Sequence, residues 1–97
     1  MCVRVELNGV LTVRTGVERS SVEVPDEATP VDIVEALERE CGPQIRPALL
    51  KGDRLRSDTV AIRTSTDGSQ QLTSQSTIRD GDTVRFEFED PDLPAYN

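Results

Sequence analysis

Residues 29–43 constrain the fold most, because they carry the start and stop signals of a single long helix. Thr29 supplies a capping hydroxyl, Pro30 occupies the first helical position, and Asp32 places a carboxylate in the first turn. Gly42-Pro43 ends the segment, since proline cannot continue a helix. An apolar stripe at helical spacing comprises Val31, Val34, Leu37 and Cys41. The segment therefore predicts one amphipathic helix from about Pro30 to Cys41.

Two alternating segments near the ends of the chain predict the sheet that this helix covers. Residues 2–7 alternate between apolar and charged side chains, which is typical of a half-buried strand. Residues 83–89 alternate most clearly, and Val84, Phe86 and Phe88 are expected to face the helix. Because aromatic residues make up only 3% of the chain, the core must be mainly aliphatic.

The segments between these elements are less regular. Asn8-Gly9 is a hairpin signal, and residues 10–17 form either a second strand or a looser connection to a strand at residues 20–24. Residues 44–57 predict an irregular crossover. Val60 and Ile62 alternate with Ala61 and Arg63 in a short strand, which a polar turn at residues 66–69 ends.

Composition excludes several classes of function. The chain carries 18 acidic and 11 basic side chains, a net charge of −7, and no histidine. Histidine-dependent catalysis and imidazole metal sites are therefore absent, and the acidic balance disfavours nucleic acids and anionic membranes. No apolar run has the length of a signal peptide or a membrane span, and Cys2 and Cys41 form no Cys-x-x-Cys motif. We expect a cytoplasmic, non-enzymatic protein with reduced thiols, no metal and no cofactor.

Four segments, residues 3–7, 15–18, 22–37 and 78–86, together resemble a known family. The last reads Ile78-Arg-Asp-Gly-Asp-Thr-Val-Arg-Phe, a turn with an acidic residue on each side of glycine that leads into a strand. Their order is similar to that of the β-grasp superfamily, specifically the small sulfur-carrier proteins of the molybdopterin-synthase small-subunit (MoaD) and thiamine sulfur-carrier (ThiS) type, distant relatives of ubiquitin. The resemblance implies an α+β, ubiquitin-like β-grasp domain at residues 1–89, with a mixed four- to five-stranded sheet packed against one helix. Its first and last strands would be central and parallel, and residues 90–97 would form a short extended tail.

The end of the chain departs from the family pattern. The family's chemistry takes place at a Gly-Gly carboxy terminus, which an activating enzyme adenylates and which then becomes a thiocarboxylate. Here no Gly-Gly dipeptide occurs, and the last residue is Asn97. We therefore expect an accessory or adaptor protein that binds another protein, either an enzyme subunit or an adenylating E1-like enzyme. The alternatives are a sulfur carrier or ubiquitin-like modifier that uses Asn97 as its activated carboxylate, and a small regulatory subunit anchored by its tail.

Two groups of residues are candidates for binding this partner. The first is predicted to lie on the outer face of the last strand and its neighbour, and comprises Arg63, Arg85, Glu87 and Glu89. The second is Leu93 and Tyr96 in the tail, whose apolar side chains would insert into a groove of the partner or fold back onto the domain.

Overall fold

A computed structural model describes residues 1–66 and 68–89. Its helices and strands are β1 Cys2–Leu7, α1 Val10–Thr15, β2 Arg19–Glu23, α2 Pro30–Cys41, α3 Ile45–Leu49, β3 Leu50–Lys51, β4 Arg54–Leu55, β5 Thr59–Ser65, β6 Gly68–Leu72 and β7 Thr83–Phe88. No helix within these ranges is long and apolar enough to cross a membrane.

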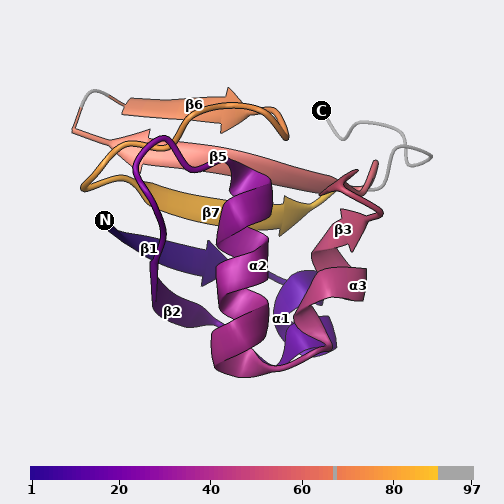
Figure 1. The fold of residues 1–97 in the computed structure, drawn as a ribbon. Helices are drawn as coiled ribbons and strands as arrows, with labels where there is room; N and C mark the ends of the chain where they lie inside the picture. Colours follow the sequence, from indigo (N-terminus) through magenta and orange to yellow (C-terminus); the bar gives the residue numbers. More distant parts are fainter. Residues whose placement is uncertain (67, 90–97) are drawn as a thin grey trace, which may run out of the picture.

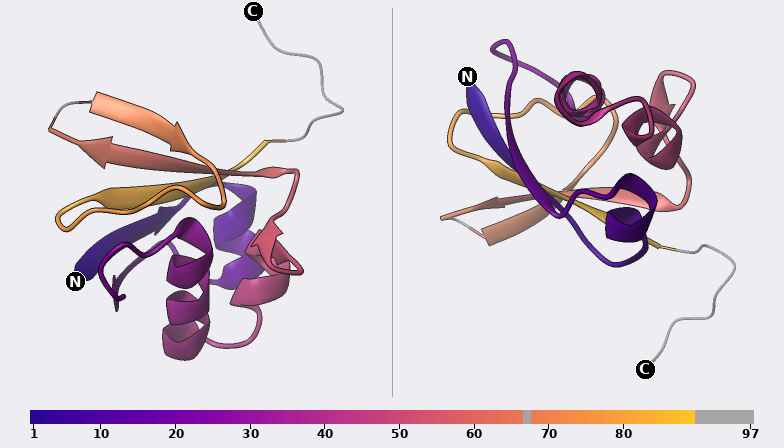
Figure 2. Two further views of the ribbon diagram at one scale, coloured as in Figure 1. Left: turned by 45° about the horizontal axis from the view of Figure 1, so that its top comes forward. Right: turned by 90° about the horizontal axis from the view of Figure 1, so that it is seen from below.

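The main sheet is mixed and has five strands in the order β2-β1-β7-β5-β6 (Figure 1). β1 and β7 pair in parallel at its centre, whereas the other pairs are antiparallel. The three helices lie on one side of the sheet, and α2 runs across it (Figure 2). The predicted fold class and the central, parallel position of the first and last strands are confirmed. The prediction of a single helix is incomplete, because α1 and α3 cover the same side.

Helix α2 has the predicted bounds, and a capping box begins it. The Asp32 amide donates to Thr29 Oγ1 (3.4 Å), and the Thr29 amide donates to Asp32 Oδ2 (2.9 Å). Ile33, Val34 and Leu37 are completely buried against the sheet. Their burial is the main source of stability for this layer, since each such side chain contributes about 1.5–3 kcal/mol.

Residues 10–15 form a short helix within the connection from β1 to β2, so the alternative of a second strand was wrong, and the connection is more regular than expected. Gly9, with a φ of 55°, immediately precedes the helix, and the first amides bond back along it: Leu11 N–H to the carbonyl oxygen of Asn8 (3.2 Å) and Thr12 N–H to that of Gly9 (3.1 Å). The Thr12 side chain then donates to the carbonyl oxygen of Leu7 (2.7 Å). Gly16 ends the helix in the left-handed conformation, with its amide bonded to the carbonyl oxygen of Thr12 (2.8 Å).

The predicted irregular crossover at residues 44–57 is more regular than expected. It contains α3 and a two-stranded hairpin of β3 and β4, in which Leu50 lies opposite Leu55. Ile45 and Leu49 are completely buried beside α2. These elements were not predicted because each is only two to five residues long, which is too short to show a helical or alternating pattern.

Candidate protein-binding surface

The outer face of the sheet, which no helix covers, carries two of the predicted residues. Arg85 and Glu87 alternate with buried residues along β7, and each side chain is 36% exposed. Arg85 Nε lies 3.6 Å from Glu87 Oε1, which also accepts a bond from Asn8 Nδ2 (3.4 Å). Glu89 follows directly and is exposed, while its amide donates to the carbonyl oxygen of Asp58 (2.7 Å). These three charged side chains therefore lie at the end of β7.

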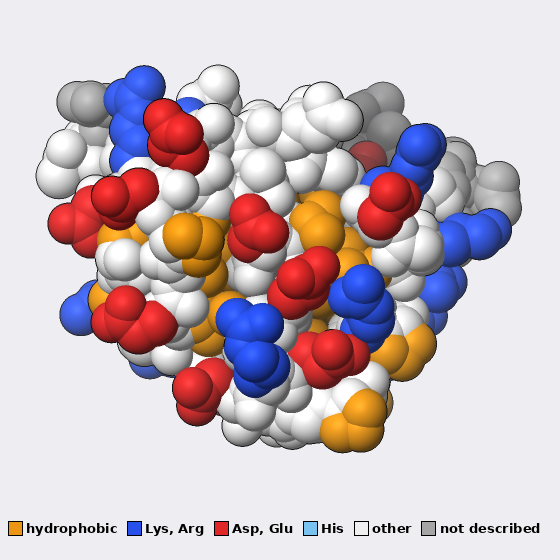
Figure 3. Space-filling view, in the orientation of Figure 1, with side chains coloured by type: hydrophobic (Ala, Val, Ile, Leu, Met, Phe, Trp, Pro, Cys, Tyr) orange, Lys and Arg blue, Asp and Glu red, His pale blue; other side chains and the backbone are white. Residues whose placement is uncertain are grey.

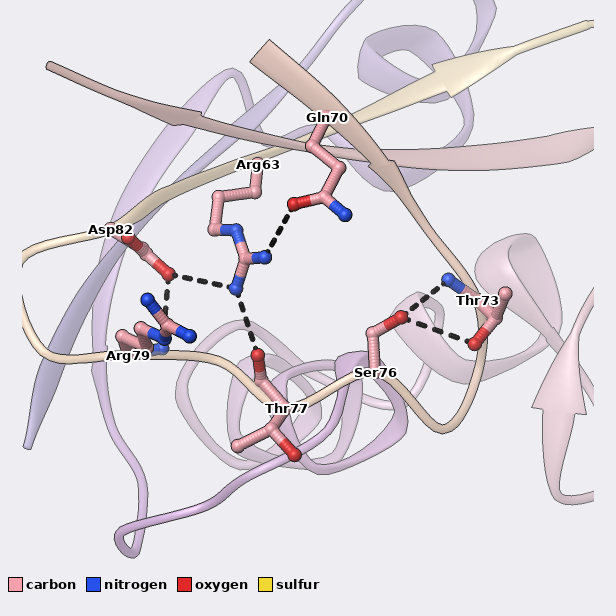
Figure 4. Close-up of polar contacts among 7 residues, drawn as sticks. All are labelled: Arg63, Gln70, Thr73, Ser76, Thr77, Arg79 and Asp82. Atoms are coloured by element: carbon pink, nitrogen blue, oxygen red, sulfur yellow. Dashed lines mark hydrogen bonds and ion pairs between the residues drawn. The ribbon is translucent and has the colours of Figure 1, made fainter. Parts of the chain in front are cut away.

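Arg63 does not belong to this face, so its predicted position was wrong. Arg63 lies opposite Val84 in the β5–β7 ladder, and directly opposed residues share a face, so its side chain lies on the helix side. There it donates to the carbonyl oxygen of Thr77 (2.9 Å) and to Gln70 Oε1 (2.6 Å), and it pairs with Asp82 (3.5 Å) (Figure 4). Arg63 therefore holds together β5, β6 and the segment before β7.

Arg63 lies on the helix side because Val60 and Ile62, the larger apolar residues of β5, lie on the outer face instead of the expected helix side. Ala61 is completely buried opposite Phe86, whereas Val60 and Ile62 are half-buried on the outer face, where Ile62 lies opposite Arg85. Because side chains in a strand alternate with a period of two, this choice moves Arg63 inward. Residues 60–62 are all apolar, so the local sequence does not show whether Ala61 or its two neighbours point inward. Pairing with the neighbouring strands decides it.

Exposed apolar side chains on α1 extend this surface and were not predicted. Val10 is 42% exposed and Val13 is 85% exposed. A shallow pocket beside them is lined by Asn8, Gly9, Val10, Glu87, Phe88 and Glu89. The spacing of three residues between the two valines is a helical signal, but the hairpin signal before them concealed it.

Charged groups hold the end of β7 beside this pocket. The Arg14 guanidinium carbon lies 5.1 Å from the centre of the Phe88 ring, within the range of a cation–π contact. Arg56 Nε donates to Asp58 Oδ1 (3.2 Å). Burial disfavours the charged carboxylate, but the hydrogen bond from Arg56 and the charges of Arg56 and Arg14 outweigh it, so the pKa of Asp58 lies below its usual 3.8.

Leu93, Tyr96 and Asn97 lie outside the described residues. Cys2 is exposed and Cys41 is half-buried, and both are free thiols. Within residues 1–66 and 68–89, no group of three or more Asp, Glu or Cys side chains is arranged to hold a metal ion.

We refer to residues Val10, Val13, Arg85, Glu87 and Glu89 as the β7-end surface. Val10, Glu87 and Glu89 line the shallow pocket, Val13 follows Val10 by about one helical turn, and Arg85 precedes Glu87 on the same face of β7. Such a surface offers apolar area and charge for binding another protein, and the described side chains there include no nucleophile with an adjacent base.

The fold closely matches solved structures of small proteins. SAMP1 from Haloferax volcanii is 18% identical, with 97% of this chain and 100% of that chain covered and a TM-score of 0.75. A chain of the BexX/CysO complex from Amycolatopsis orientalis is 18% identical, with 94% and 99% covered and a TM-score of 0.72. A molybdopterin converting factor subunit 1 from Pyrococcus furiosus is 17% identical, with 91% and 97% covered and a TM-score of 0.66.

No protein-family model and no curated protein matches the chain by sequence. The structural matches nevertheless agree in topology with the family that the sequence resembles. The chain therefore has the β-grasp, ubiquitin-like fold of the small modifier and molybdopterin-converting-factor proteins.

Proposed function

We propose that this chain is a non-enzymatic protein-binding module that serves as an accessory or adaptor subunit of another protein. The observation that carries the proposal is the position of Val10 and Val13. They are the only large hydrophobic side chains that are exposed in the described part of the chain. Val10 lines the pocket at the end of β7, and Val13 follows it by about one turn of α1. Exposed apolar side chains bordered by charged ones are typical of protein interfaces.

The β7-end surface suits a partner with an apolar centre and a basic rim. Val10 and Val13 supply the apolar contact, whereas Glu87 and Glu89 supply carboxylates beside it. Burial of an exposed valine contributes about 1–2 kcal/mol, so the two valines supply enough to affect affinity by about tenfold or more. The resemblance to the sulfur-carrier family favours an enzyme subunit or an E1-like adenylating enzyme as this partner. One structural neighbour belongs to a BexX/CysO complex and another is a converting-factor subunit, which supports binding to a second protein.

A second candidate function is that of a sulfur carrier or modifier whose activated carboxylate is Asn97. The neighbours favour it, since one of them is described as a small archaeal modifier protein. The 97 residues contain no Gly-Gly dipeptide, on which that chemistry depends in the resembled family, so this candidate requires activation of a different residue. In either role the protein acts in a reducing compartment such as the cytoplasm, which the two free cysteines favour.

The test is to purify the tagged full chain from its own cells and to identify what accompanies it. We expect an unmodified chain in a stoichiometric complex with one protein. Val13→Asp should abolish the complex, because a carboxylate would have to be buried at the apolar contact. Gln75→Asp, which adds the same charge to an exposed loop, is the matched control and should retain the partner.

Three results separate the candidate functions. A carboxy-terminal thiocarboxylate or a covalent adduct in the intact mass would favour the carrier or modifier. Loss of the partner with Val13→Asp but not with Gln75→Asp supports the adaptor. If both variants retain the partner equally, the β7-end surface does not bind it.

A further inference from the structure

Three arginines on the outer sheet face lie around Glu6, and one of them, Arg85, also pairs with Glu87. Arg19 on β2 lies directly opposite Glu6, and Arg85 on β7 lies beside it on the other side. Arg4 precedes Glu6 by two residues on β1, so its side chain is on the same face. Arg4 and Arg19 are diagonal neighbours across the two strands, at a separation of about 7–8 Å that side chains of this length span easily. We call Arg4, Arg19 and Arg85 the arginine cluster.

Most of the cluster's hydrogen-bonding capacity is unused among the described residues. Arg4 and Arg19 are exposed, and neither forms an ion pair or a side-chain hydrogen bond within residues 1–66 and 68–89. Arg85 Nε is buried and has no hydrogen-bond partner there; its only ion pair is the 3.6 Å contact with Glu87. The guanidinium groups of Arg4 and Arg19 are therefore the donors of the cluster that a ligand with acceptor oxygens can reach.

The cluster contrasts with the charge of the rest of the molecule. The chain has a net charge of −7, and α2 alone carries four acidic residues and one arginine. Figure 3 shows acidic side chains spread over the side that α2 covers. The three arginines lie on the opposite side of the sheet, which also carries Glu6, Glu23 and Glu87. On this side the local attraction for an anionic segment comes from Arg4 and Arg19, whose charges no ion pair offsets within residues 1–66 and 68–89.

A shallow hollow lies within the cluster. It is lined by Arg4, Val5, Glu6, Arg19, Ser20 and Ser21. Ser21 is opposite Arg4, and its short side chain leaves room beside the two guanidinium groups. β2 is also an edge strand of the sheet, so an extended segment can approach the hollow along it.

We propose that the arginine cluster binds carboxylate side chains of an acidic, extended segment of the partner protein. The inference rests on the proposed function, because it assigns a chemistry to that same partner. Guanidinium groups bind carboxylates through paired, charge-assisted hydrogen bonds. Two arginines that flank a hollow can each donate to the carboxylate of an acidic residue in one extended segment. Glu6, at the centre of the cluster, repels any anion placed directly beside it, so the carboxylates are expected to bind on the far sides of Arg4 and Arg19.

The experiment uses the full chain and a synthetic probe, so it does not depend on knowing the partner. A capped peptide of three Glu-Ser repeats is titrated into isotope-labelled protein and followed by NMR, beside a Gln-Ser peptide of equal length. We expect the Glu peptide alone to shift the Arg4, Arg19 and Arg85 side-chain signals and the Ser21 amide. Binding should weaken as salt is raised, since the contacts are exposed charges.

Two variants make the test specific. R4Q/R19Q should weaken Glu-peptide binding by about tenfold, as expected for the loss of two charge-assisted contacts. R39Q, which removes an exposed arginine from α2, is the matched control and should change binding less than twofold. The spectra of both variants report whether each one is folded.

Several results would overturn the proposal: equal binding of the two peptides, absence of any shift at millimolar Glu peptide, or R4Q/R19Q within twofold of the wild type. The proposed function is tested separately by Val13→Asp, which lies on α1 and should leave peptide binding intact. Loss of the partner with Val13→Asp, together with a failed peptide titration, would leave the adaptor role standing and remove only the carboxylate chemistry.

Discussion

Arg63 and Val84 lie directly opposite each other on β5 and β7, so an arginine shares the helix side of the sheet with a completely buried valine. The guanidinium reaches the polar end of that side, where it pairs with Asp82 and donates to the carbonyl oxygen of Thr77. The Arg63 side chain is 17% exposed and the Asp82 side chain is 8% exposed. This pair therefore connects the segment before β7 to the sheet in a largely dry environment.

Removal of this arginine should be costly. Arg63→Gln leaves the buried Asp82 carboxylate without its ion-pair partner, so the free energy of unfolding should fall by about 1–3 kcal/mol. Denaturant unfolding measures the change. Arg39→Gln, which removes an exposed arginine, is the control and should stay within about 0.5 kcal/mol of the wild type. Equal stabilities of the two variants would mean that the Arg63 network contributes nothing.

The inward position of Ala61 predicts that two neighbouring substitutions change the stability of the fold by different amounts. Ala61→Leu adds volume opposite Phe86 in the packed core, so it should destabilise the fold by about 1–3 kcal/mol. Val60→Leu adds a methylene on the outer face and should change stability by less than about 0.5 kcal/mol. Thermal and denaturant unfolding of both variants test the assignment, and the reverse order would place Val60 in the core.

Helix α1 can be tested through one buried and one exposed residue. Leu11 is completely buried, so Leu11→Ala should lower the free energy of unfolding by about 2–5 kcal/mol. Val13→Ala, at a side chain that is 85% exposed, should change it by less than about 0.5 kcal/mol. Similar losses for both variants would be expected of an alternating strand with both residues inward, and would contradict the helix.

The lowered pKa of Asp58 predicts a pH dependence of stability. A carboxyl group with a lower pKa in the folded state stabilises the fold above its unfolded pKa, near 3.8, and loses that contribution as the pH falls through the folded value. Asp58→Asn should therefore be less stable than the wild type at pH 7, and the difference should shrink below about pH 4. Asp53→Asn, at an exposed position, is the control. A difference that is constant from pH 7 to pH 2.5 would contradict the role of the Asp58 charge.

The proposed domain boundary predicts the effect of truncation. A chain that ends at Glu89 should retain the fold, because β7, the last strand, ends at Phe88 and pairs with β1 and β5. Its NMR spectrum and unfolding midpoint should match those of the full chain. If Leu93 and Tyr96 bind the partner, the truncated chain should fold but lose the complex. An unfolded product would contradict the boundary.

Much of the fold could be predicted from local pattern. The capping signals around Thr29 and the stripe that follows specify α2, because both depend on residues within one or two helical turns. The alternation at residues 83–89 specifies β7 in the same way. The match to the order of β-grasp elements then supplied the parallel pairing of the first and last strands, which no local pattern contains.

Other features depended on contacts between distant segments. Asn8-Gly9 has the composition of a hairpin turn, yet Gly9 instead begins α1, whose buried Leu11 packs in the core. The β7-end surface was missed in part for this reason, since its exposed valines lie on that helix.

The sequence by itself determined the bounds of α2 and the outer position of Arg85 and Glu87, because periodicity and capping are local properties. The β-grasp class came from its resemblance to a known family. The tertiary structure alone decided which face of β5 turns inward, and with it the burial of Arg63. When both faces of a strand carry apolar residues, either face can turn inward at nearly the same local energy. The packing of Ala61 against Phe86 decides which face of β5 does so. It also brought Arg4, Arg19 and Arg85 together, because residues from three strands meet only when the sheet forms.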